Sequence, residues 1–481
     1  MIDELQPYAE YKDSVHPFLD QVPSHWHEKR AKYFYREVDE RSTTGEEELL
    51  SVSHKTGVTP RPKHVTMFKA ESNIGHKICR PGDLAINTMW AFMGALGVAR
   101  QVGVVSPSYG VYRPLEKDGL LPTYIDQLLR TEDYKAEYLC RSTGIRSSRL
   151  RLYPDEFLRI PLLCPPPEEQ AAIVHFLDHV DRRIRRYIRA KRQLIALLNE
   201  QKQAIIHRAV TRGLDPNVRL KPSGVEWLGE IPEHWEVRRL KTLLHRIDQG
   251  ISPQAEARLA NDGAWGVLKS GCVNHGVFRE TEHKRLPDGF AVNKELAVRD
   301  GDVLVSRACG SPKLVGSVGR VRELRYRLIL SDKTFRLVFR EPQLVDFAVT
   351  AMSSRYFRLQ VEQAISGAEG LANNLPLTSL RDLLIVVPSA GEAQQIASTL
   401  GGSLERLSSL VGSAEREVEL MLEYRASLIA KVVTGAMDVR DATAQLPTEV
   451  DEIVDTIEEP IDDEEFDESA ELVAEAGEID P

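Results

Sequence analysis

The stretch PPPEEQAAI at Pro165–Ile173 returns as PSAGEAQQI at Pro388–Ile396, 223 residues later. Each copy opens a long run rich in leucine, isoleucine and charged residues. The same offset aligns Gly144–Asp215 with Gly367–Asp438, and the alignment needs no insertion. A similarity that recurs at a fixed offset over this length indicates an internal duplication of one structural unit.

Two further echoes extend the duplication upstream. The motif VPSHW, which ends at Trp26, matches IPEHW, which ends at Trp235, and RPGDLAI from Arg80 matches RDGDVLV from Arg299. The order of the echoes predicts a globular segment, a helix, and the same pair again. The expected organisation is a first globular segment at 1–160, a helical spacer at 161–220, a second globular segment at 221–384, a second spacer at 385–440, and a tail at 441–481.

The run that follows each proline motif has the spacing of a long helix. Apolar residues recur in alternating steps of four and three, from Ile173 in the first copy and from Ile396 in the second. This heptad pattern predicts a packing seam along each helix. The two helices could pair within one chain or dimerise between chains, and the duplication favours the first because it supplies both partners. The seam residues named from this pattern are Ile173, Leu177, Val180, Ile184, Leu194, Leu198, Ile396, Leu400, Leu407, Leu410, Met421 and Leu428.

The ends of the predicted helices carry the expected signals. Prolines precede each start, where a missing N–H costs nothing. Glu168, Glu169 and Glu392 fall in the first turns, where a carboxylate is stabilised by the helix dipole. Gly213 and Gly435 mark the ends.

The outer surface of the first helix is unusually basic. RRIRRYIRAKR, from Arg182 to Arg192, has seven basic residues in eleven, whereas the second helix is closer to balance. Such a run is compatible with a solvated face, with a position near DNA phosphates, or with an acidic partner.

The net charge of −10 conceals two different regions. From Glu449 to Pro481 there are 16 Asp and Glu residues and no Lys or Arg, which leaves residues 1–448 with 62 basic and 56 acidic residues, a net charge of +6. The block DDEEFDE repels itself, so we expect the tail to be disordered. The tail could solubilise the protein, be inert, or mimic DNA and compete for the basic surface.

The bulk composition favours a cytoplasmic protein of two or three domains. No apolar run approaches the roughly 18–20 residues of a membrane helix, and the start, MIDELQ, lacks the features of a signal peptide. The five cysteines are scattered and without CxxC spacing, which argues against disulfides and a zinc site. The globular segments combine short strands, such as VLVS at Val303–Ser306, with many turns, which predicts a mixed α+β fold.

The sequence contains no recognisable catalytic signature. It lacks the GxxxxGK[ST] phosphate loop and the motifs of an amino methyltransferase, and Pro287-Asp288 begins a nuclease motif that is not completed. His25 and His234 precede the matched tryptophans, but one histidine and one tryptophan make neither a metal site nor a triad, so we predict a structural staple. The chain is expected to be a binding platform with no metal and no cofactor of its own.

Taken in order, these duplicated motifs resemble the specificity (S) subunits of type I restriction–modification systems. The resemblance covers about residues 19–440. It rests on PPPEEQ with its weaker copy PSAGEA, on VPSHW with IPEHW, and on PGDLAINTMW with VSPSY. The second copy departs at Ala393, where the first has Gln170, and the acidic tail is unusual for the family.

The resemblance implies a non-catalytic DNA-recognition subunit. Each globular segment would be a target recognition domain that reads one half of a bipartite, asymmetric DNA sequence. The two helices would pair as an antiparallel coiled coil with pseudo-two-fold symmetry, and would dock two methyltransferase subunits. Those partners would methylate adenine N6 with S-adenosylmethionine, and motor-nuclease subunits would cleave unmodified DNA with ATP and Mg²⁺, in defence against foreign DNA.

Sequence reading requires polar or basic side chains at base edges and phosphates. The candidates in the turn-rich, divergent segments are His54, Lys55, Arg61, Lys63, Asn87, Trp90, Lys269, Asn274, Lys284, Arg285, Arg307, Lys313 and Lys333. Two rival hypotheses remain: a coiled-coil adaptor joining two peptide-binding modules, and a fused nuclease, which Mg²⁺-dependent cutting by the chain alone would establish.

Overall fold

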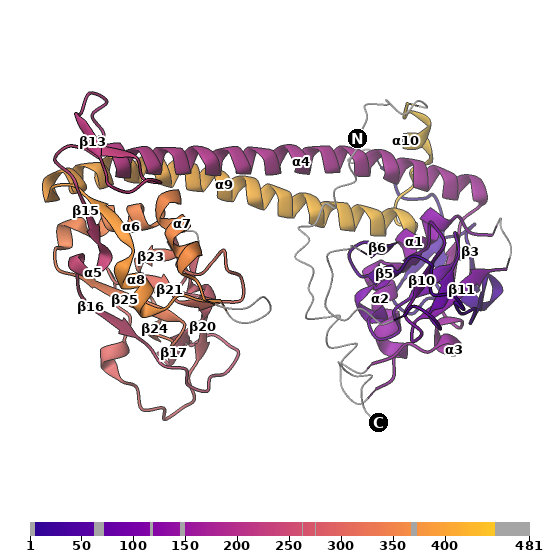
Figure 1. The fold of residues 1–481 in the computed structure, drawn as a ribbon. Helices are drawn as coiled ribbons and strands as arrows, with labels where there is room; N and C mark the ends of the chain where they lie inside the picture. Colours follow the sequence, from indigo (N-terminus) through magenta and orange to yellow (C-terminus); the bar gives the residue numbers. More distant parts are fainter. Residues whose placement is uncertain are drawn as a thin grey trace. The chain divides into compact units, whose positions relative to one another are not determined.

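The computed structural model describes residues 5–61, 72–115, 119–144, 150–261, 263–274, 276–366 and 373–447. The chain divides into two compact units. Unit 1 consists of Met1–Arg192 with Arg416–Pro481, and unit 2 consists of Gln193–Glu415. Each unit mixes helix and strand, as predicted (Figure 1). The long helices α4 (Pro167–Arg212) and α9 (Ala390–Val433) each contribute one part to each unit.

Unit 1 is built around a four-stranded sheet with the strand order β4-β11-β8-β9. Helices α1 and α2 follow the sheet, and strand β12 leads into α4 (Figure 1). The elements in chain order are β1 (Tyr11–Asp13), β2 (Gln21–Pro23), β3 (His27–Arg30), η1 (Ala31–Tyr33), β4 (Tyr35–Glu37), β5 (Leu50–Ser53), β6 (Gly57–Pro60), β7 (Lys77–Cys79), β8 (Leu84–Ile86), η2 (Ala91–Met93), β9 (Leu96–Val98), β10 (Gly103–Val105), β11 (Gly110–Pro114), α1 (Pro122–Leu129), α2 (Glu132–Arg141), α3 (Pro154–Phe157), β12 (Pro161–Cys164) and, after α9, α10 (Arg440–Ala444).

Unit 2 has a corresponding four-stranded sheet with the order β16-β25-β21-β23, and a second sheet, β20-β17-β24. Its elements are β13 (Leu220–Pro222), β14 (Glu230–Pro232), β15 (Glu236–Arg239), α5 (Leu240–Leu243), β16 (Leu244–Gln249), β17 (Trp265–Leu268), η4 (Ser270–Cys272), β18 (Val273–Asn274), β19 (Val277–Phe278), β20 (His283–Arg285), η5 (Lys294–Leu296), β21 (Val303–Ser306), β22 (Ala308–Cys309), β23 (Val318–Arg320), β24 (Arg327–Ile329), β25 (Thr334–Phe339), η6 (Pro342–Leu344), α6 (Val345–Met352), α7 (Arg355–Ala364), β26 (Asn373–Asn374), α8 (Leu377–Asp382) and β27 (Leu384–Val387).

The strand registers repeat between the units at the offsets read from the sequence. In the first hairpin, Tyr11 lies opposite Pro23, and in its counterpart Leu220 lies opposite Pro232. The strand that enters each long helix pairs in the same way, with β12 antiparallel to β3 and β27 antiparallel to β15. The two units therefore share one backbone frame, although the domain boundaries drawn from the sequence remain a prediction.

The Arg-x-Gly-Asp echo is explained by a turn that precedes a central strand. Gly82 has a φ of +92°, a backbone conformation that is unfavourable for any residue with a Cβ atom. Asp83 is buried, accepts a hydrogen bond from the backbone N–H of Arg80 (3.0 Å), and pairs with Arg113 on the neighbouring strand (2.8 Å). The counterparts in unit 2 are Gly301 (φ +89°), Asp302, Arg299 and Arg336.

A buried carboxylate, that of Glu169, joins the start of α4 to the His-Trp motif of unit 1 by hydrogen bonds. Glu169 accepts hydrogen bonds from Nε1–H of the fully buried Trp26 (2.9 Å) and from the hydroxyl of Tyr8, and its Oε2 lies 2.8 Å from His25 Nε2. This arrangement explains why the His-Trp motif and the glutamate of the first helical turn occur together in the sequence.

Unit 2 repeats this tie with fewer donors. Glu392 accepts from Trp235 Nε1–H (2.8 Å) and lies 2.9 Å from His234 Nε2. At the same place α4 ends, with Gly213 at a φ of +74°, where a Cβ atom would lie 3.3 Å from the Trp235 ring. The geometry supports the predicted structural role of the His-Trp motif, because in both units the tryptophan donates a hydrogen bond to the glutamate in the first turn of one long helix.

The core of each unit extends onto the long helices. In unit 1, Ile173, Phe176 and Ile184 of α4 and Val432 of α9 belong to one buried cluster with Trp26. In unit 2, Ile206 and Val210 of α4 and Ile396 and Leu400 of α9 join the cluster around Trp235. Most of the predicted seam is therefore covered: Ile173, Leu177, Val180, Ile184, Ile396, Leu400 and Leu428 are buried, and Leu198, Leu407 and Met421 are partly buried.

The prediction of a covered seam is wrong at Leu194 and Leu410, which are 42% and 55% exposed. The stripe on α4 passes instead through Ile188, which is buried, and Ile195, which is partly buried. The reason is the pitch of the α-helix. In a straight helix, positions seven residues apart are rotated by about 20° around the helix axis, so a strict heptad repeat slowly leaves the packed face. Two successive steps of four residues, from Val180 through Ile184 to Ile188, bring the apolar positions back to that face.

Contacts between α4 and α9 occur within each unit. In unit 1, Asp181 pairs with Arg425, and Lys191 Nζ lies 2.8 Å from Glu417. The numbers rise along one helix as they fall along the other, so the two segments run in opposite directions there. In unit 2, Lys202 donates to Ser408 Oγ (2.9 Å). In the described part of the chain, no helix has both the length and the apolar character needed to cross a membrane.

Candidate nucleic-acid interface

The candidates of the first globular segment lie on two turns. His54 and Lys55 form the turn between β5 and β6, whose carbonyls accept hydrogen bonds from Arg130 Nη2, at 2.9 Å for His54. Arg61 follows β6 and donates its backbone N–H to Leu49 (2.9 Å). Lys63 lies outside the described residues. Arg130, the C-terminal cap of α1, therefore supports a hairpin turn that presents an exposed lysine.

Asn87 and Trp90 lie after β8, in the segment that leads to β9. Asn87 is only 4% exposed, and its Nδ2 donates to the Tyr109 hydroxyl (2.9 Å) while its Oδ1 accepts from Met89 N–H (3.2 Å). In this structure its amide shapes the turn. Trp90 is half-buried and stacks with Phe92 at 6.4 Å between ring centroids. Trp90 is thus the more accessible of the two.

In unit 2, Arg307 and Lys333 are brought together by the pairing of β21 with β25. Arg307 donates its backbone N–H to Lys333 O (2.8 Å) and its Nη1–H to Asp332 O (2.9 Å). Its guanidinium lies 5.8 Å from the centroid of the Phe335 ring. Lys333 and Lys313 are exposed. The Arg307 side chain is therefore held in place, and its backbone pairs with that of the exposed Lys333.

Lys269 and Asn274 flank the short helix η4. Lys269 Nζ lies 3.6 Å from Glu282, a partly exposed pair of the kind that contributes little to stability. Asn274 is half-buried, and its Oδ1 is buried without a hydrogen-bond partner among the described residues.

Lys284 and Arg285 belong to β20, an outer strand of the second sheet. Lys284 is exposed, whereas Arg285 is held by Asp288 (2.6 Å) and by Glu256 (3.7 Å). Arg285 also borders a cavity of about 480 Å³ that the sequence did not indicate. The other lining residues are Arg258, Leu259, Asn261, Gly263, Ala264 and Asp288.

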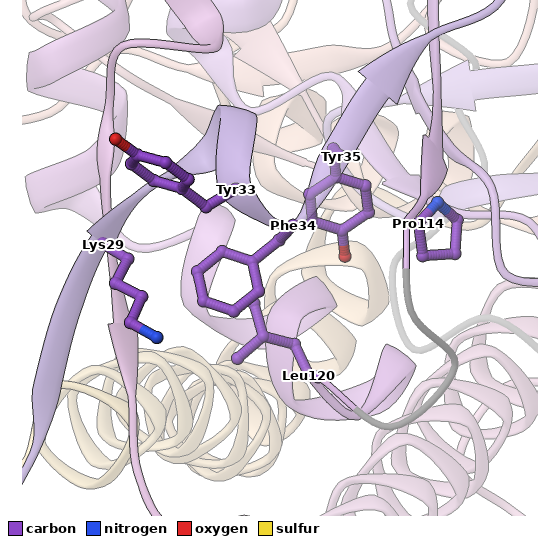
Figure 2. Close-up of a pocket in the computed structure, with 7 residues that line it drawn as sticks. Lys29, Tyr33, Phe34, Tyr35, Pro114 and Leu120 are labelled. Carbon is purple, nitrogen blue, oxygen red and sulfur yellow. The ribbon is translucent and has the colours of Figure 1, made fainter.

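A second cavity, of about 470 Å³, lies in unit 1 beside β3 and β4. Figure 2 shows Lys29 on one side of this hollow and Tyr35 with Pro114 on the other. Tyr33, Phe34, Gly119 and Leu120 complete the lining. The sequence signal for this cavity is the aromatic run Tyr33–Tyr35.

The buried thiols and the candidate side chains differ in the chemistry that they can support. Burial raises the pKa of the Cys79 and Cys272 thiols to about 12, so neither is a thiolate nucleophile near neutral pH. In the described part of the chain, no three His, Cys, Asp or Glu side chains gather into a set that could hold a metal ion. The candidate side chains offer hydrogen-bond donors and positive charge, which suit phosphate and base edges.

Comparison with curated proteins gives relatives of one kind, although no protein-family model matches the chain. The type I restriction enzyme EcoEI specificity subunit of Escherichia coli is 30% identical over 173 residues, which are 36% of this chain and 29% of that subunit. The MjaVIII specificity subunit of Methanocaldococcus jannaschii is 25% identical over 326 residues, 66% of this chain and 71% of that protein. The EcoKI specificity subunit of Escherichia coli is 21% identical over 340 residues, 68% of each chain.

The fold has a counterpart among solved structures. A chain from a study of complex assembly and conformational transition in a type I restriction–modification system superimposes with a TM-score of 0.57 at 14% identity, over 86% of this chain and 98% of that one. This likeness concerns the fold. The chain is thus similar in sequence to the specificity subunits of type I restriction enzymes and in fold to a chain of a type I restriction–modification system, which confirms the resemblance predicted from its duplicated motifs.

Proposed function

We propose that this chain is the DNA sequence-recognition subunit of a type I restriction–modification complex and that it is not itself catalytic. The observation that carries the proposal is one backbone frame used twice with different side chains on its loops. The strand registers match between the units, whereas the segments after the matched central strands read NTMWAFMGALG from Asn87 and SRACGSPKLVG from Ser306. Two such domains suit a target with two different half-sites.

The two globular segments act as target recognition domains in tandem, and α4 and α9 pair as an antiparallel coiled coil that sets the distance between half-sites. The opposite course of the helices at Asp181 and Arg425 supports this arrangement. At about 1.5 Å per residue, the 46 residues of α4 span about 70 Å. A helix of that length is about as long as two turns of B-DNA, at about 34 Å per turn.

Two methyltransferase subunits dock on matched faces of the helices. Leu197 of α4 and Leu420 of α9 are related by the repeat offset and are 55% and 59% exposed. Tyr187 and Leu410, related by the same offset, are also exposed. Because large apolar side chains that stay exposed at equivalent positions suit two copies of one partner, they support this docking. S-adenosylmethionine belongs to those partners, and ATP and Mg²⁺ to the motor-nuclease subunits, in the cytoplasm.

The proposal is tested by a methylome. The chain is co-expressed with its adenine methyltransferase partner in a host without DNA methylation, and N6-methyladenine is mapped by sequencing. A split motif with one methylated adenine in each half is expected. Absence of methylation from a complex that assembles and binds S-adenosylmethionine would contradict the proposal, and a DNA-binding assay would then identify a non-DNA scaffold.

A further inference from the structure

The cavity beside β3 and β4 has an aromatic lining that belongs to unit 1 alone. At the offset that relates the two His-Trp motifs, the run Tyr33–Tyr35 corresponds to TLL at 242–244. The backbone is the same in both places. The middle carbonyl of each run accepts a hydrogen bond from the residue after the neighbouring strand, Leu115 N–H (2.8 Å) in unit 1 and Arg340 N–H (2.9 Å) in unit 2. Since unit 2 builds this frame without aromatic residues, the fold does not require the aromatic lining of unit 1.

One side chain of the lining is a buried hydrogen-bonding group. Tyr35 is only 4% exposed, and within the described ranges of the chain its hydroxyl has no hydrogen-bond partner. A buried tyrosine hydroxyl usually has one. Burial raises the pKa of Tyr35, so the group is a neutral hydroxyl near neutral pH and can donate or accept. Because Tyr35 lines the cavity, a ligand there can supply the missing partner.

The other lining residues offer flat apolar surfaces and one positive charge. Tyr33 is 62% exposed and Phe34 is partly buried, so both rings are accessible from the cavity. Lys29 is exposed and has no ion-pair partner in the part of the chain that the structure describes. Figure 2 shows the Lys29 ammonium and the Tyr35 hydroxyl on opposite sides of the Phe34 ring. Aromatic rings stack on planar groups such as nucleobases, and a lysine attracts a phosphate.

The singular occurrence of this lining limits what it can bind. Two identical docked subunits need equivalent surfaces, and unit 2 lacks this one. A paired duplex keeps its base faces stacked and cannot offer them to a protein ring. The volume of about 470 Å³ lies in the range of small-molecule sites, roughly 300–1,000 Å³. These properties together suit one small ligand that is planar, carries a hydrogen-bond acceptor and is negatively charged.

We propose that the cavity lined by Lys29, Tyr33, Phe34 and Tyr35 binds a single unpaired nucleotide. Its base lies against the rings of Tyr33 and Phe34, the Tyr35 hydroxyl hydrogen-bonds to it, and Lys29 holds the phosphate. The nucleotide is either a free nucleoside monophosphate or one that has left the stack of a DNA strand. This inference goes beyond the recognition of a target sequence and does not depend on it.

The test titrates the full-length chain with adenosine 5′-monophosphate at low salt and follows saturation transfer to the nucleotide by NMR. Tyr35→Phe, which removes only the hydroxyl, should weaken binding about 2–10-fold, the range of one neutral hydrogen bond. Tyr33→Thr, which installs the residue of unit 2, should weaken it at least about fivefold through lost stacking. Lys29→Gln should also weaken it at least about fivefold, but should leave the affinity for adenosine, which has no phosphate, unchanged.

The matched control is Arg238→Gln, which removes one positive charge at the position of unit 2 that corresponds to Lys29 and should change nothing. Two short duplexes of arbitrary sequence, one fully paired and one with a single bulged nucleotide, then compete with the monophosphate. Displacement by the bulged duplex alone identifies a nucleotide of a strand, and displacement by neither identifies the free nucleotide. Absence of saturation transfer, equal displacement by both duplexes, or affinities that the three unit 1 variants leave unchanged would overturn the inference.

Discussion

The buried carboxylates at the helix starts give a quantitative prediction, because the two copies differ in how many donors they satisfy. Replacing Glu169 by Ala leaves the Nε1–H of Trp26 and the hydroxyl of Tyr8 without an acceptor, and both side chains are buried. Each buried group left unsatisfied costs about 1–3 kcal/mol, so the loss of stability should be about 2–6 kcal/mol. Replacing Glu392 by Ala leaves one buried donor, Trp235 Nε1–H, without an acceptor, and should lower the free energy of unfolding by about 1–3 kcal/mol.

The assay is urea unfolding of both variants, with hydrogen exchange of the amides around each tryptophan to assign the loss to unit 1 or unit 2. The controls are Glu169→Gln and Glu392→Gln, which keep one acceptor oxygen and should recover part of the stability. Equal losses for the two alanine variants, a larger loss for Glu392→Ala, or no recovery with glutamine would refute the argument from donor counting.

Three further predictions concern docking, DNA contact and pH. The double variant L197S/L420S should weaken binding of the methyltransferase partner at least about tenfold in a pull-down titration while leaving the unfolding midpoint unchanged, because both side chains are exposed; a normal complex would remove this face from the docking site. Arg307→Ala should weaken specific DNA binding by about 1–3 kcal/mol, whereas Arg325→Ala, a side chain 82% exposed, should change it little, and equal effects would remove Arg307 from the candidates. Burial, together with the nearby Arg141 cation, lowers the pKa of His16 to about 4. The contribution of neutral His16 to the free energy of unfolding is therefore fully present above the ordinary pKa of 6.5 and is lost as the pH falls towards 4. The unfolding midpoints of the wild type and of His16→Gln should converge between these pH values, and midpoints that change in parallel would contradict this prediction.

The duplicated frame was readable from the sequence because backbone features leave strong local signals. The Arg-x-Gly-Asp motif reflects a glycine with positive φ and an aspartate that accepts the backbone N–H of the motif's arginine and pairs with an arginine of the neighbouring strand. The His-Trp motif reflects the hydrogen bond to Glu169 or Glu392. These roles need particular residue types at fixed spacing, so they survive in both copies. The sequence marks Glu169 only as a residue that the helix dipole favours, since its contact with Trp26 joins residues far apart in the chain.

The seam was predicted less well than the frame, for a physical reason, and the candidate surface stays a prediction. Leu194 and Ile195 are both apolar, and only the packing of the helix decides which one is covered. Asn87 is polar, yet its amide serves a turn, because a side chain of that size can pair with a neighbouring hydroxyl. Which of the polar residues read bases stays a prediction, since exposure and charge alone do not distinguish a base contact from a solvated surface.

The central claim is that each globular segment reads its own half of a split target. The most direct measurement exchanges residues 1–160 for the corresponding segment of another type I specificity subunit and maps the methylated motif of the hybrid complex. The account predicts a new sequence in one half, with the other half and the gap unchanged. A change in both halves, or none, from a hybrid that still methylates would contradict it.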